Sequence, residues 1–258
     1  MSSLMNAWTW VVTILIVLVG FVVVTAVFLV TAPFDPGRYA AGRAFRLLGV
    51  AQVKLNPFWR FRTSGVRVRD PRRPYVAVAN HESYADIFLI SHLPWEMKWL
   101  SKDTIFRIPV MGWMMSMAGD VRLVRGNRSS AVDAIAACRD RLARRVSVMI
   151  FPEGTRSRDG ELLPFKDGAF RLAVETGTPI LPIAVAGTRH AMAKGSFRFR
   201  RADALCHVLE PIPTQGLGMD DVPALRERVR TLLMEARHRL ERELGLSSTY
   251  HTTAPTAD

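Results

Sequence analysis

The sequence predicts an α/β domain, a mostly parallel sheet flanked by helices, preceded by a membrane-anchoring helix. From residue 75 onward, short apolar runs alternate with longer segments of helical periodicity. This pattern is typical of parallel strands joined by helices. A long uncharged run precedes that region, and 258 residues are enough for one buried core plus an appendage.

The N-terminal run Ala7–Val30 has 24 residues and no charged side chain, and the first charge in the chain is Asp35. As a helix it would be about 36 Å long, more than the roughly 30 Å of a bilayer core. A cleaved signal peptide would have a basic start and a shorter apolar run. We therefore predict an anchor within residues 1–33. A helix bent near Gly20 that enters one leaflet would give the same hydropathy.

The next segment, residues 34–66, is predicted to form an amphipathic helix and a connector. When Gly37–Leu55 is projected at about 100° per residue, its basic side chains fall in one half of the wheel and most apolar ones in the other. The basic residues are Arg38, Arg43, Arg46 and Lys54. A basic face directly after an anchor favours a helix in the membrane interface, although a helix packed on the domain is the alternative. By the positive-inside tendency, we expect the following domain on the cytoplasmic side of the cell membrane.

Residues 67–246 are predicted to form the α/β domain, and the polar residues 247–258 a flexible tail. Short apolar runs predict an edge strand at Val66–Arg69 and further strands at Tyr75–Ala79, Lys98–Leu100, Val121–Val124, Val146–Phe151, Ile180–Ala186 and Leu205–Leu209. Helical periodicity and capping residues predict helices at Ser83–Leu93, Ser129–Arg144, Asp167–Glu175 and Pro223–Leu244.

The chain is basic, with 35 Lys and Arg against 23 Asp and Glu, a net charge of +12. Such a surface favours nucleic acid, anionic lipid or phosphorylated substrates as partners. Cys138 and Cys206 lack metal-ligand spacing and are too few for a disulfide scaffold, so we expect reduced thiols. The sequence contains no HExxH motif or His/Cys cluster, and no metal site is predicted.

Two polar stretches follow predicted strands. NHESYAD, Asn80–Asp86, comes directly after the first strong strand, and FPEGTRS, Phe151–Ser157, begins where the strand Val146–Phe151 ends. Because ligands bind beyond the carboxyl ends of parallel strands, both stretches should open on one edge of the sheet. This arrangement would bring His81 near Glu153 and Arg156.

His81 and Asp86 have the residue types of a general base and its orienting carboxylate. Histidine accepts a proton near neutral pH. On a continuous helix the pair would be about 140° apart, so it converges only if His81 lies in a turn and Asp86 in the first helical turn. The carboxylate would then orient the imidazole and stabilise the imidazolium. There is no G-x-S-x-G nucleophile motif, so the base would act on a substrate hydroxyl. Taken alone, the spacing also fits a structural histidine.

FPEGTRS combines a glycine turn at Gly154 with the hydroxyl of Thr155 and the bidentate donor Arg156. Backbone amides and a guanidinium make a good phosphate site, although a charged surface turn would have the same composition. Lys102 and Arg125 add cations after other predicted strands.

Together these stretches resemble the lysophosphatidate (1-acylglycerol-3-phosphate) acyltransferase family, the PlsC-like glycerolipid acyltransferases. NHESYAD is similar to the family's N-H-x4-D block, and FPEGTRS is identical to its F-P-E-G-T-R-S block. The middle and fourth blocks resemble Lys102, Pro109, Gly112 and Arg125, and Pro179–Val185 with Pro182. The four blocks follow the family's order across Tyr75–Gly187. Val124 stands where many members carry Asp, a departure that bears on the role of Arg125.

The resemblance implies a reaction without an acyl-enzyme. His81, oriented by Asp86, would deprotonate the free hydroxyl of a lysolipid, which would attack the thioester of acyl-CoA or acyl-carrier protein. The implied substrate-binding residues are Glu153, Gly154, Thr155, Arg156, Lys102 and Arg125, with Arg156 holding the acceptor phosphate with help from Lys102 and Arg125. No cofactor or metal is implied, and the acyl donor is a co-substrate.

Two alternatives remain open at this point. The same His81–Asp86 chemistry would serve another acceptor, such as a lyso-ornithine lipid, another lysophospholipid or a glycolipid. A basic, membrane-tethered nucleic-acid-binding protein would explain the net charge, but not four blocks in order, and no RNA-binding aromatic motif or zinc pattern is present. The expected partners are therefore membrane lipids and the acyl donor, not nucleic acid.

Overall fold

A computed structural model describes residues 2–157, 161–196 and 198–246, and the expected tail, residues 247–258, lies outside them. Within these residues a seven-stranded sheet has the order β1-β7-β6-β2-β5-β3-β4. The strands are β1 Trp59–Gly65, β2 Val76–Ala79, β3 Met97–Lys102, β4 Val121–Leu123, β5 Ser147–Ile150, β6 Ile180–Ala186 and β7 Ala202–Val208. Only β6 and β7 pair antiparallel. The predicted mostly parallel α/β fold is confirmed.

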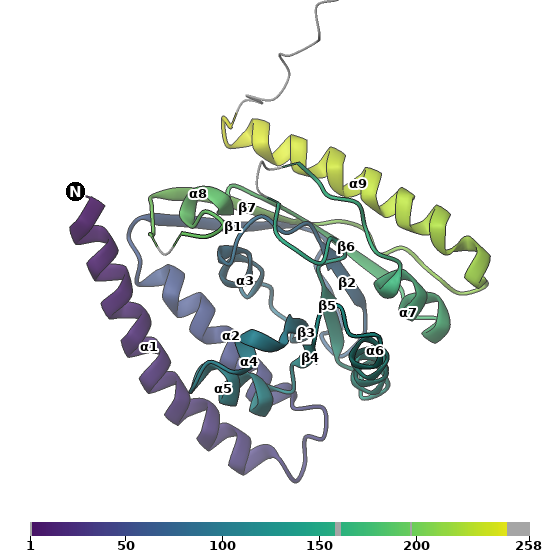
Figure 1. Cartoon of the computed structure of the whole chain (residues 1–258), viewed down its shortest axis with the longest axis horizontal. Coiled ribbons are helices and arrows are strands. Elements are labelled where there is room, and N and C mark those ends of the chain that lie inside the picture. The colour runs from purple at the N-terminus through teal and green to yellow at the C-terminus, as the bar shows by residue number, and fades with distance from the viewer. Residues whose placement is uncertain (1, 158–160, 197, 247–258) are drawn as a thin grey trace, which may run out of the picture.

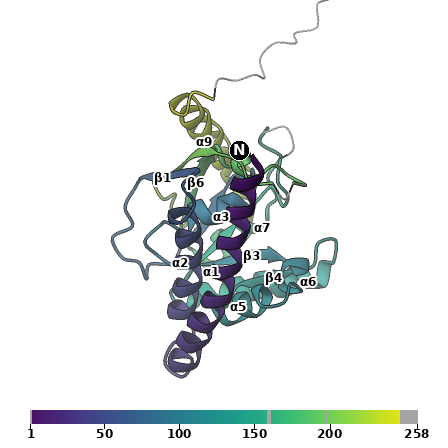
Figure 2. The same ribbon diagram turned by 90° about the vertical axis from the view of Figure 1, so that its left-hand side faces the viewer.

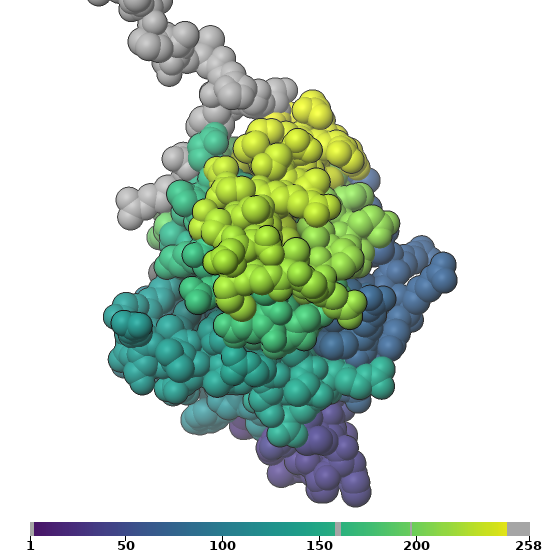
Figure 3. Space-filling view, turned by 90° about the vertical axis from the view of Figure 1, so that its right-hand side faces the viewer, coloured from purple at the N-terminus to yellow at the C-terminus, as the bar shows by residue number. Residues whose placement is uncertain are grey.

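Helices cover both faces of the sheet (Figure 1). The outer face carries α6 Arg128–Ala143, α7 Gly168–Thr176 and α9 Val222–Glu243, which follows the 3-10 turn η1 Met219–Asp221. The other face carries α3 Ala85–Ile90, beside α2 Tyr39–Lys54, α8 Thr188–Ala191, α4 Asp103–Phe106 and α5 Met111–Ala118. Figure 3 shows α9, in yellow, spread over the outer face. Alternate side chains of each strand enter opposite cores, as strand geometry requires.

The two cysteines lie in these cores. Cys138 and Cys206 are both free thiols and both buried, as the sequence predicted. Burial raises the pKa of Cys138 to about 12 and also raises the pKa of Cys206, so both thiols stay protonated and unreactive near neutral pH.

Helix α1, Ser2–Thr31, runs alongside α2 and α5 (Figures 1 and 2). Its Ser3–Thr31 portion, in which an 18-residue window has a mean hydropathy of 3.1, is long and apolar enough to cross a membrane. The inner side of the helix contacts the domain: the Trp8 indole donates to the Leu55 carbonyl at 3.2 Å, and Gly20 lies against Leu48. Its outer side exposes large apolar side chains, including Leu4, Val11, Leu15, Leu18, Val22 and Leu29. The helix is therefore a candidate membrane anchor that also packs on its own domain.

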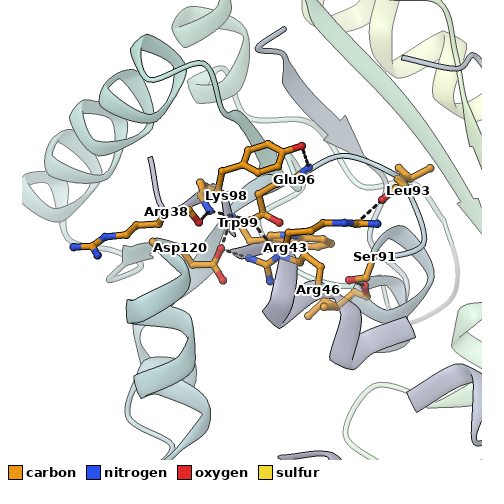
Figure 4. A network of polar contacts seen from close by, with 12 residues as sticks. Arg38, Arg43, Arg46, Ser91, Leu93, Glu96, Lys98, Trp99 and Asp120 are labelled. Atoms are coloured by element: carbon orange, nitrogen blue, oxygen red, sulfur yellow. Dashed lines mark hydrogen bonds and ion pairs between the residues drawn. The ribbon is translucent and has the colours of Figure 1, made fainter. Parts of the chain in front are cut away.

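The predicted helix after the anchor exists, but the expectation that its basic face lies at the membrane interface is wrong for Arg46. Arg46 is 5% exposed and pairs with the buried carboxylates of Asp120 and Glu96. On the same side, Arg43 donates to the Leu93 carbonyl at 2.9 Å. Figure 4 shows these side chains directed into the domain. A helical projection separates the polar face of a helix from its apolar face. It does not show whether the polar face contacts lipid headgroups or buried acids of the same domain.

Lys98 completes this buried network of charges. Its amine lies 3.0 Å from Glu96 Oε1 and donates to the Arg38 carbonyl at 2.7 Å (Figure 4). Burial raises the pKa of Glu96 and lowers the pKa of Lys98, while each partner's charge opposes the shift. Gly42 allows the close approach, because a methyl group there would collide with both Glu96 and Lys98.

The expected edge strand Val66–Arg69 is also wrong, because the strand is β1, Trp59–Gly65. It pairs in parallel with β7, and the rings of Trp59 and Phe61 stack with centroids 5.1 Å apart. Exposed polar and basic residues alternate with these two rings and hide the apolar signal. The sheet therefore begins before residue 67, within the segment assigned as a connector.

Replacing Lys98 by Met is expected to lower the free energy of unfolding by about 3–5 kcal/mol, because it leaves an uncompensated buried charge. Chemical denaturation of the full chain in detergent measures the loss. The double substitution Glu96→Gln with Lys98→Met should recover most of it, since the remaining Arg46–Asp120 pair is neutral. As a control, Arg145→Met breaks an exposed pair with Asp70 and should cost less than about 1 kcal/mol. Equal losses for the two single variants would contradict the account.

Candidate active site

The loop after β2 is fixed by its neighbours on the sheet. The Asn80 side chain donates to the Val185 carbonyl and accepts from the Val185 N–H, both at 2.8 Å. The Ser83 hydroxyl donates to the Met192 carbonyl at 2.7 Å. These bonds tie the loop to β6 and to the segment after it, so the His81 backbone has a defined position.

His81 and Asp86 meet in this loop. His81 Nδ1 lies 2.7 Å from Asp86 Oδ2, which also accepts the backbone N–H groups of Glu82 at 2.9 Å and Ser83 at 3.0 Å. Asp86 is fully buried, and its other oxygen accepts the Thr188 hydroxyl. A carboxylate only accepts, so Nδ1 carries the hydrogen and Nε2 is left with the lone pair that can take a proton.

The imidazole is also held by its face. Its ring stacks on Phe151, with centroids 3.9 Å apart and planes at 14°. Phe151 in turn contacts the Trp99 ring at 5.8 Å. The Asp86 bond and the Phe151 stack together fix the direction of the ring. The His81 side chain is only 11% exposed.

The FPEGTRS loop is hydrogen-bonded to the NHESYAD loop, as expected from their positions after parallel strands. Glu153 Oε1 accepts the His81 N–H at 2.7 Å, and Oε2 accepts the Leu163 N–H at 3.0 Å. The Ser157 N–H donates to the His81 carbonyl at 3.1 Å. Burial raises the pKa of Glu153 to about 7, against the opposing effect of its two backbone bonds. Both Glu153 oxygens are used within the protein, so this side chain shapes the site by joining two loops.

The rest of FPEGTRS turns toward the start of α3. Gly154 has a φ of 68°, a left-handed conformation that favours glycine. The Lys194 amine donates to the Arg156 carbonyl at 2.6 Å and lies 3.4 Å from the Thr155 hydroxyl. The Arg156 ζ carbon lies 3.8 Å from the centroid of the Tyr84 ring. Arg156 therefore lies beside the loop that carries His81 and Asp86.

Lys102 and Arg125 lie farther along the same edge. Both are exposed, Lys102 at the end of β3 and Arg125 just after β4. In the order β2-β5-β3-β4, neighbouring strands are about 4.8 Å apart, which places the ends of β3 and β4 roughly 10 and 14 Å from β2. The structure thus brings Arg156 to the His81 loop, whereas these two cations are carried by strands farther along the sheet.

Sequence reasoning missed four residues that build this site: Phe151 as a ring partner, Tyr84, Thr188 and Lys194. Thr188 follows the carboxyl end of β6, as His81 follows the carboxyl end of the parallel strand β2. The rule that sites lie beyond the carboxyl ends of parallel strands would therefore have found Thr188. The roles of Tyr84 and Lys194 depend on three-dimensional contacts with Arg156 and have no local signal.

A buried acid lies next to the His–Asp pair. Glu82 is 5% exposed, with Arg237 of α9 at 3.4 Å. Burial, and then the charge of Asp86, raise the pKa of Glu82 to about 8, although Arg237 opposes the shift. Glu82 therefore holds a proton in the folded protein at a pH where an exposed glutamate has lost it.

The fold and the site define a class: α/β proteins with a His-x4-Asp pair after a central strand of the sheet, next to an arginine-bearing loop. A family model described as Acyltransferase matches residues 60–186. The human 1-acyl-sn-glycerol-3-phosphate acyltransferase alpha is 32% identical over 213 residues, covering 82% of this chain and 75% of that enzyme. The chain belongs to this acyltransferase family.

Two further comparisons extend this result. The chloroplastic 1-acyl-sn-glycerol-3-phosphate acyltransferase BAT2 of Brassica napus is 43% identical over 147 residues, 57% of this chain, and the match spans only 43% of that enzyme. The crystal structure of the 1-acyl-sn-glycerophosphate (LPA) acyltransferase PlsC from Thermotoga maritima aligns with a TM-score of 0.76 at 26% identity. That alignment covers 93% of this chain and 98% of the other.

Glu82 gives a prediction for stability against pH. An unfolded glutamate releases its proton near pH 4.5, whereas folded Glu82 keeps it up to about pH 8. The unfolded state therefore binds fewer protons in that window, and the free energy of unfolding falls as pH rises through it. In Glu82→Gln, this part of the decline should be absent.

Denaturant titrations at several pH values between about 5 and 8 measure the slope. Glu235→Gln, which removes an exposed carboxylate of α9, is the matched control and should keep the wild-type slope. An unchanged slope in Glu82→Gln would show that Glu82 is ionised in the folded protein.

Proposed function

We propose that this protein is a membrane-bound O-acyltransferase that acylates the free hydroxyl of lysophosphatidate, giving phosphatidate. The acyl group comes from acyl-CoA or acyl-carrier protein, which is the only co-substrate, and the reaction uses no cofactor. The observation that carries the proposal is the contact of His81 with the buried Asp86 carboxylate, held beside the loop of Arg156. The proposed acceptor is supported by the human, plant and bacterial relatives, which are 1-acylglycerol-3-phosphate acyltransferases by name.

The proposed chemistry has the base act on the substrate. His81 Nε2 takes the proton of the acceptor hydroxyl as its oxygen attacks the thioester carbonyl. Asp86 balances the imidazolium that forms. When the tetrahedral intermediate collapses, the carbon–sulfur bond breaks, the ester remains on the acceptor, and the imidazolium returns its proton to the leaving thiolate. The Phe151 stack keeps the ring in the direction that both transfers require.

The acceptor phosphate is assigned to the loop that follows β5. Arg156 supplies bidentate N–H donors, and Gly154 and Thr155 bring backbone and hydroxyl groups to the same turn. Lys102 and Arg125, farther along the edge, add positive potential that attracts an anionic substrate.

We also propose that the protein is attached to the cell membrane with the catalytic domain on the cytoplasmic side. The exposed apolar side of α1 supports the attachment, whether the helix crosses the bilayer or enters one leaflet. The arginines that follow α1 support the orientation, because the positive-inside tendency depends on sequence near the anchor.

A panel of acceptors with one labelled acyl donor tests the function. Lysophosphatidate is expected to be acylated faster than other lysophospholipids, a lyso-ornithine lipid, a glycolipid or glycerol 3-phosphate. His81→Ala should lower transfer by about 10²- to 10⁴-fold, the usual contribution of a general base, without unfolding the chain. His238→Ala, on the exposed side of α9, is the matched control. Turnover retained in His81→Ala would refute the base, and a preferred acceptor other than lysophosphatidate would refute the substrate.

Arg156→Ala is expected to raise the KM for lysophosphatidate by about 10- to 100-fold, because charge-assisted hydrogen bonds contribute about 1.5–3 kcal/mol each. Initial rates at varied acceptor and fixed donor measure the change. Arg139→Ala, which removes an exposed arginine of α6, should leave the KM unchanged. An effect seen only when the thioester donor is varied would assign Arg156 to the donor instead.

A further inference from the structure

The contact between Tyr84 and Arg156 joins the two motifs of the site. Tyr84 lies within the NHESYAD loop and is 40% exposed. The Arg156 ζ carbon, 3.8 Å from its ring centroid, makes the shortest of the arginine–ring contacts among the described residues. A cation over an aromatic face is attracted by about 0.5–2 kcal/mol, depending on exposure. This contact therefore favours one position of a long, flexible side chain.

Stacking leaves the hydrogen-bonding capacity of Arg156 intact. A guanidinium over a ring uses its flat face, while its N–H donors point outward in its own plane. A carboxylate partner would instead neutralise the charge and occupy those donors. Tyr84 thus restrains the direction of the arginine and leaves its donors able to bind a phosphate bidentately.

The backbone around Arg156 is already fixed on both sides. Before it, the Gly154 N–H donates to the Phe151 carbonyl at 3.0 Å, and after it, the Ser157 N–H donates to the His81 carbonyl at 3.1 Å. Lys194 holds the Arg156 carbonyl at 2.6 Å. The remaining freedom is in the arginine side chain, and ordering such a chain costs free energy on binding. The Tyr84 ring supplies that order before the substrate arrives.

We propose that Tyr84 is a positioning residue whose ring holds the Arg156 guanidinium in the orientation that binds a phosphate. The enzyme therefore prefers acceptors that carry a phosphate group. The inference rests on the proposed function, because it concerns the same acceptor site. Tyr84 lies between His81 and Asp86 in the sequence, so one loop determines the positions of both the His81 ring and the Arg156 guanidinium. An acceptor whose phosphate and free hydroxyl match that fixed separation reaches both groups at once.

Tyr84→Leu keeps an apolar side chain but removes the aromatic face. It is expected to raise the KM for lysophosphatidate by about 2- to 30-fold, the range that 0.5–2 kcal/mol gives. The ratio of kcat/KM for lysophosphatidate to that for monoacylglycerol, which lacks the phosphate, should fall by a similar factor. Tyr84→Phe, which keeps the ring, should rescue both values. A defect as large in Tyr84→Phe as in Tyr84→Leu would overturn the inference, because it would assign the effect to the hydroxyl.

A double-mutant cycle separates positioning from a general structural role. If Tyr84 acts through Arg156, then Tyr84→Leu should add little to the KM of Arg156→Ala. Full additivity of the two effects would overturn the inference. Tyr39→Leu is the matched control. The Arg72 ζ carbon lies 4.1 Å from the centroid of the Tyr39 ring, and this pair is not part of the His81 loop. The substitution should not change the KM for lysophosphatidate.

The same measurements distinguish this inference from the function on which it rests. If wild type does not acylate lysophosphatidate, or if Arg156→Ala leaves its KM unchanged, the proposed function or its phosphate assignment fails and the inference fails with it. If Arg156→Ala raises the KM while Tyr84→Leu leaves it unchanged, only the role of Tyr84 is overturned.

Discussion

The loop that carries His81 is built around one buried group, the carboxylate of Asp86. A buried carboxylate is costly unless its oxygens are hydrogen-bonded. Asp86 meets this requirement with the N–H groups of Glu82 and Ser83, the His81 ring and the Thr188 hydroxyl. These donors converge only when the loop closes on the start of α3, so the same contacts that satisfy the carboxylate also place the His81 ring.

The order of the strands explains why that loop is rigid. Strand β2 lies between β5 and β6, so the loop after it has a neighbour on each side. From the β5 side, Glu153 holds the His81 N–H, and from the β6 side, Val185 and Thr188 hold Asn80 and Asp86. A site at an outer strand would have support from one side alone. The central position of β2 therefore gives a short turn a well-defined position for the His81 side chain.

Local sequence predicted the central strands and the pairing of the two motifs, because buried runs and strand-end loops are local features. It did not predict contacts that depend on strand order, such as Thr188 with Asp86, or on side-chain packing, such as Tyr84 with Arg156. It also gave the wrong surroundings for Arg46, the membrane interface instead of buried acids. A basic face looks the same whether it meets lipid headgroups or buried acids, and only the position of Glu96 relative to α2 separates the two cases.

That correction changes how the N-terminal helices relate to the site. Arg46 of α2 lies over the Trp99 ring at 5.4 Å, Trp99 contacts Phe151 at 5.8 Å, and Phe151 stacks on the His81 ring at 3.9 Å. Arg46, the first residue of this series, is held by buried charges of opposite sign. These contacts form only when α2 has one defined position along β3. Helix α2, with α1 packed along it, is consequently part of the catalytic domain and not a loose tether. The orientation of the site relative to any membrane that α1 enters is then set by the interior of the protein.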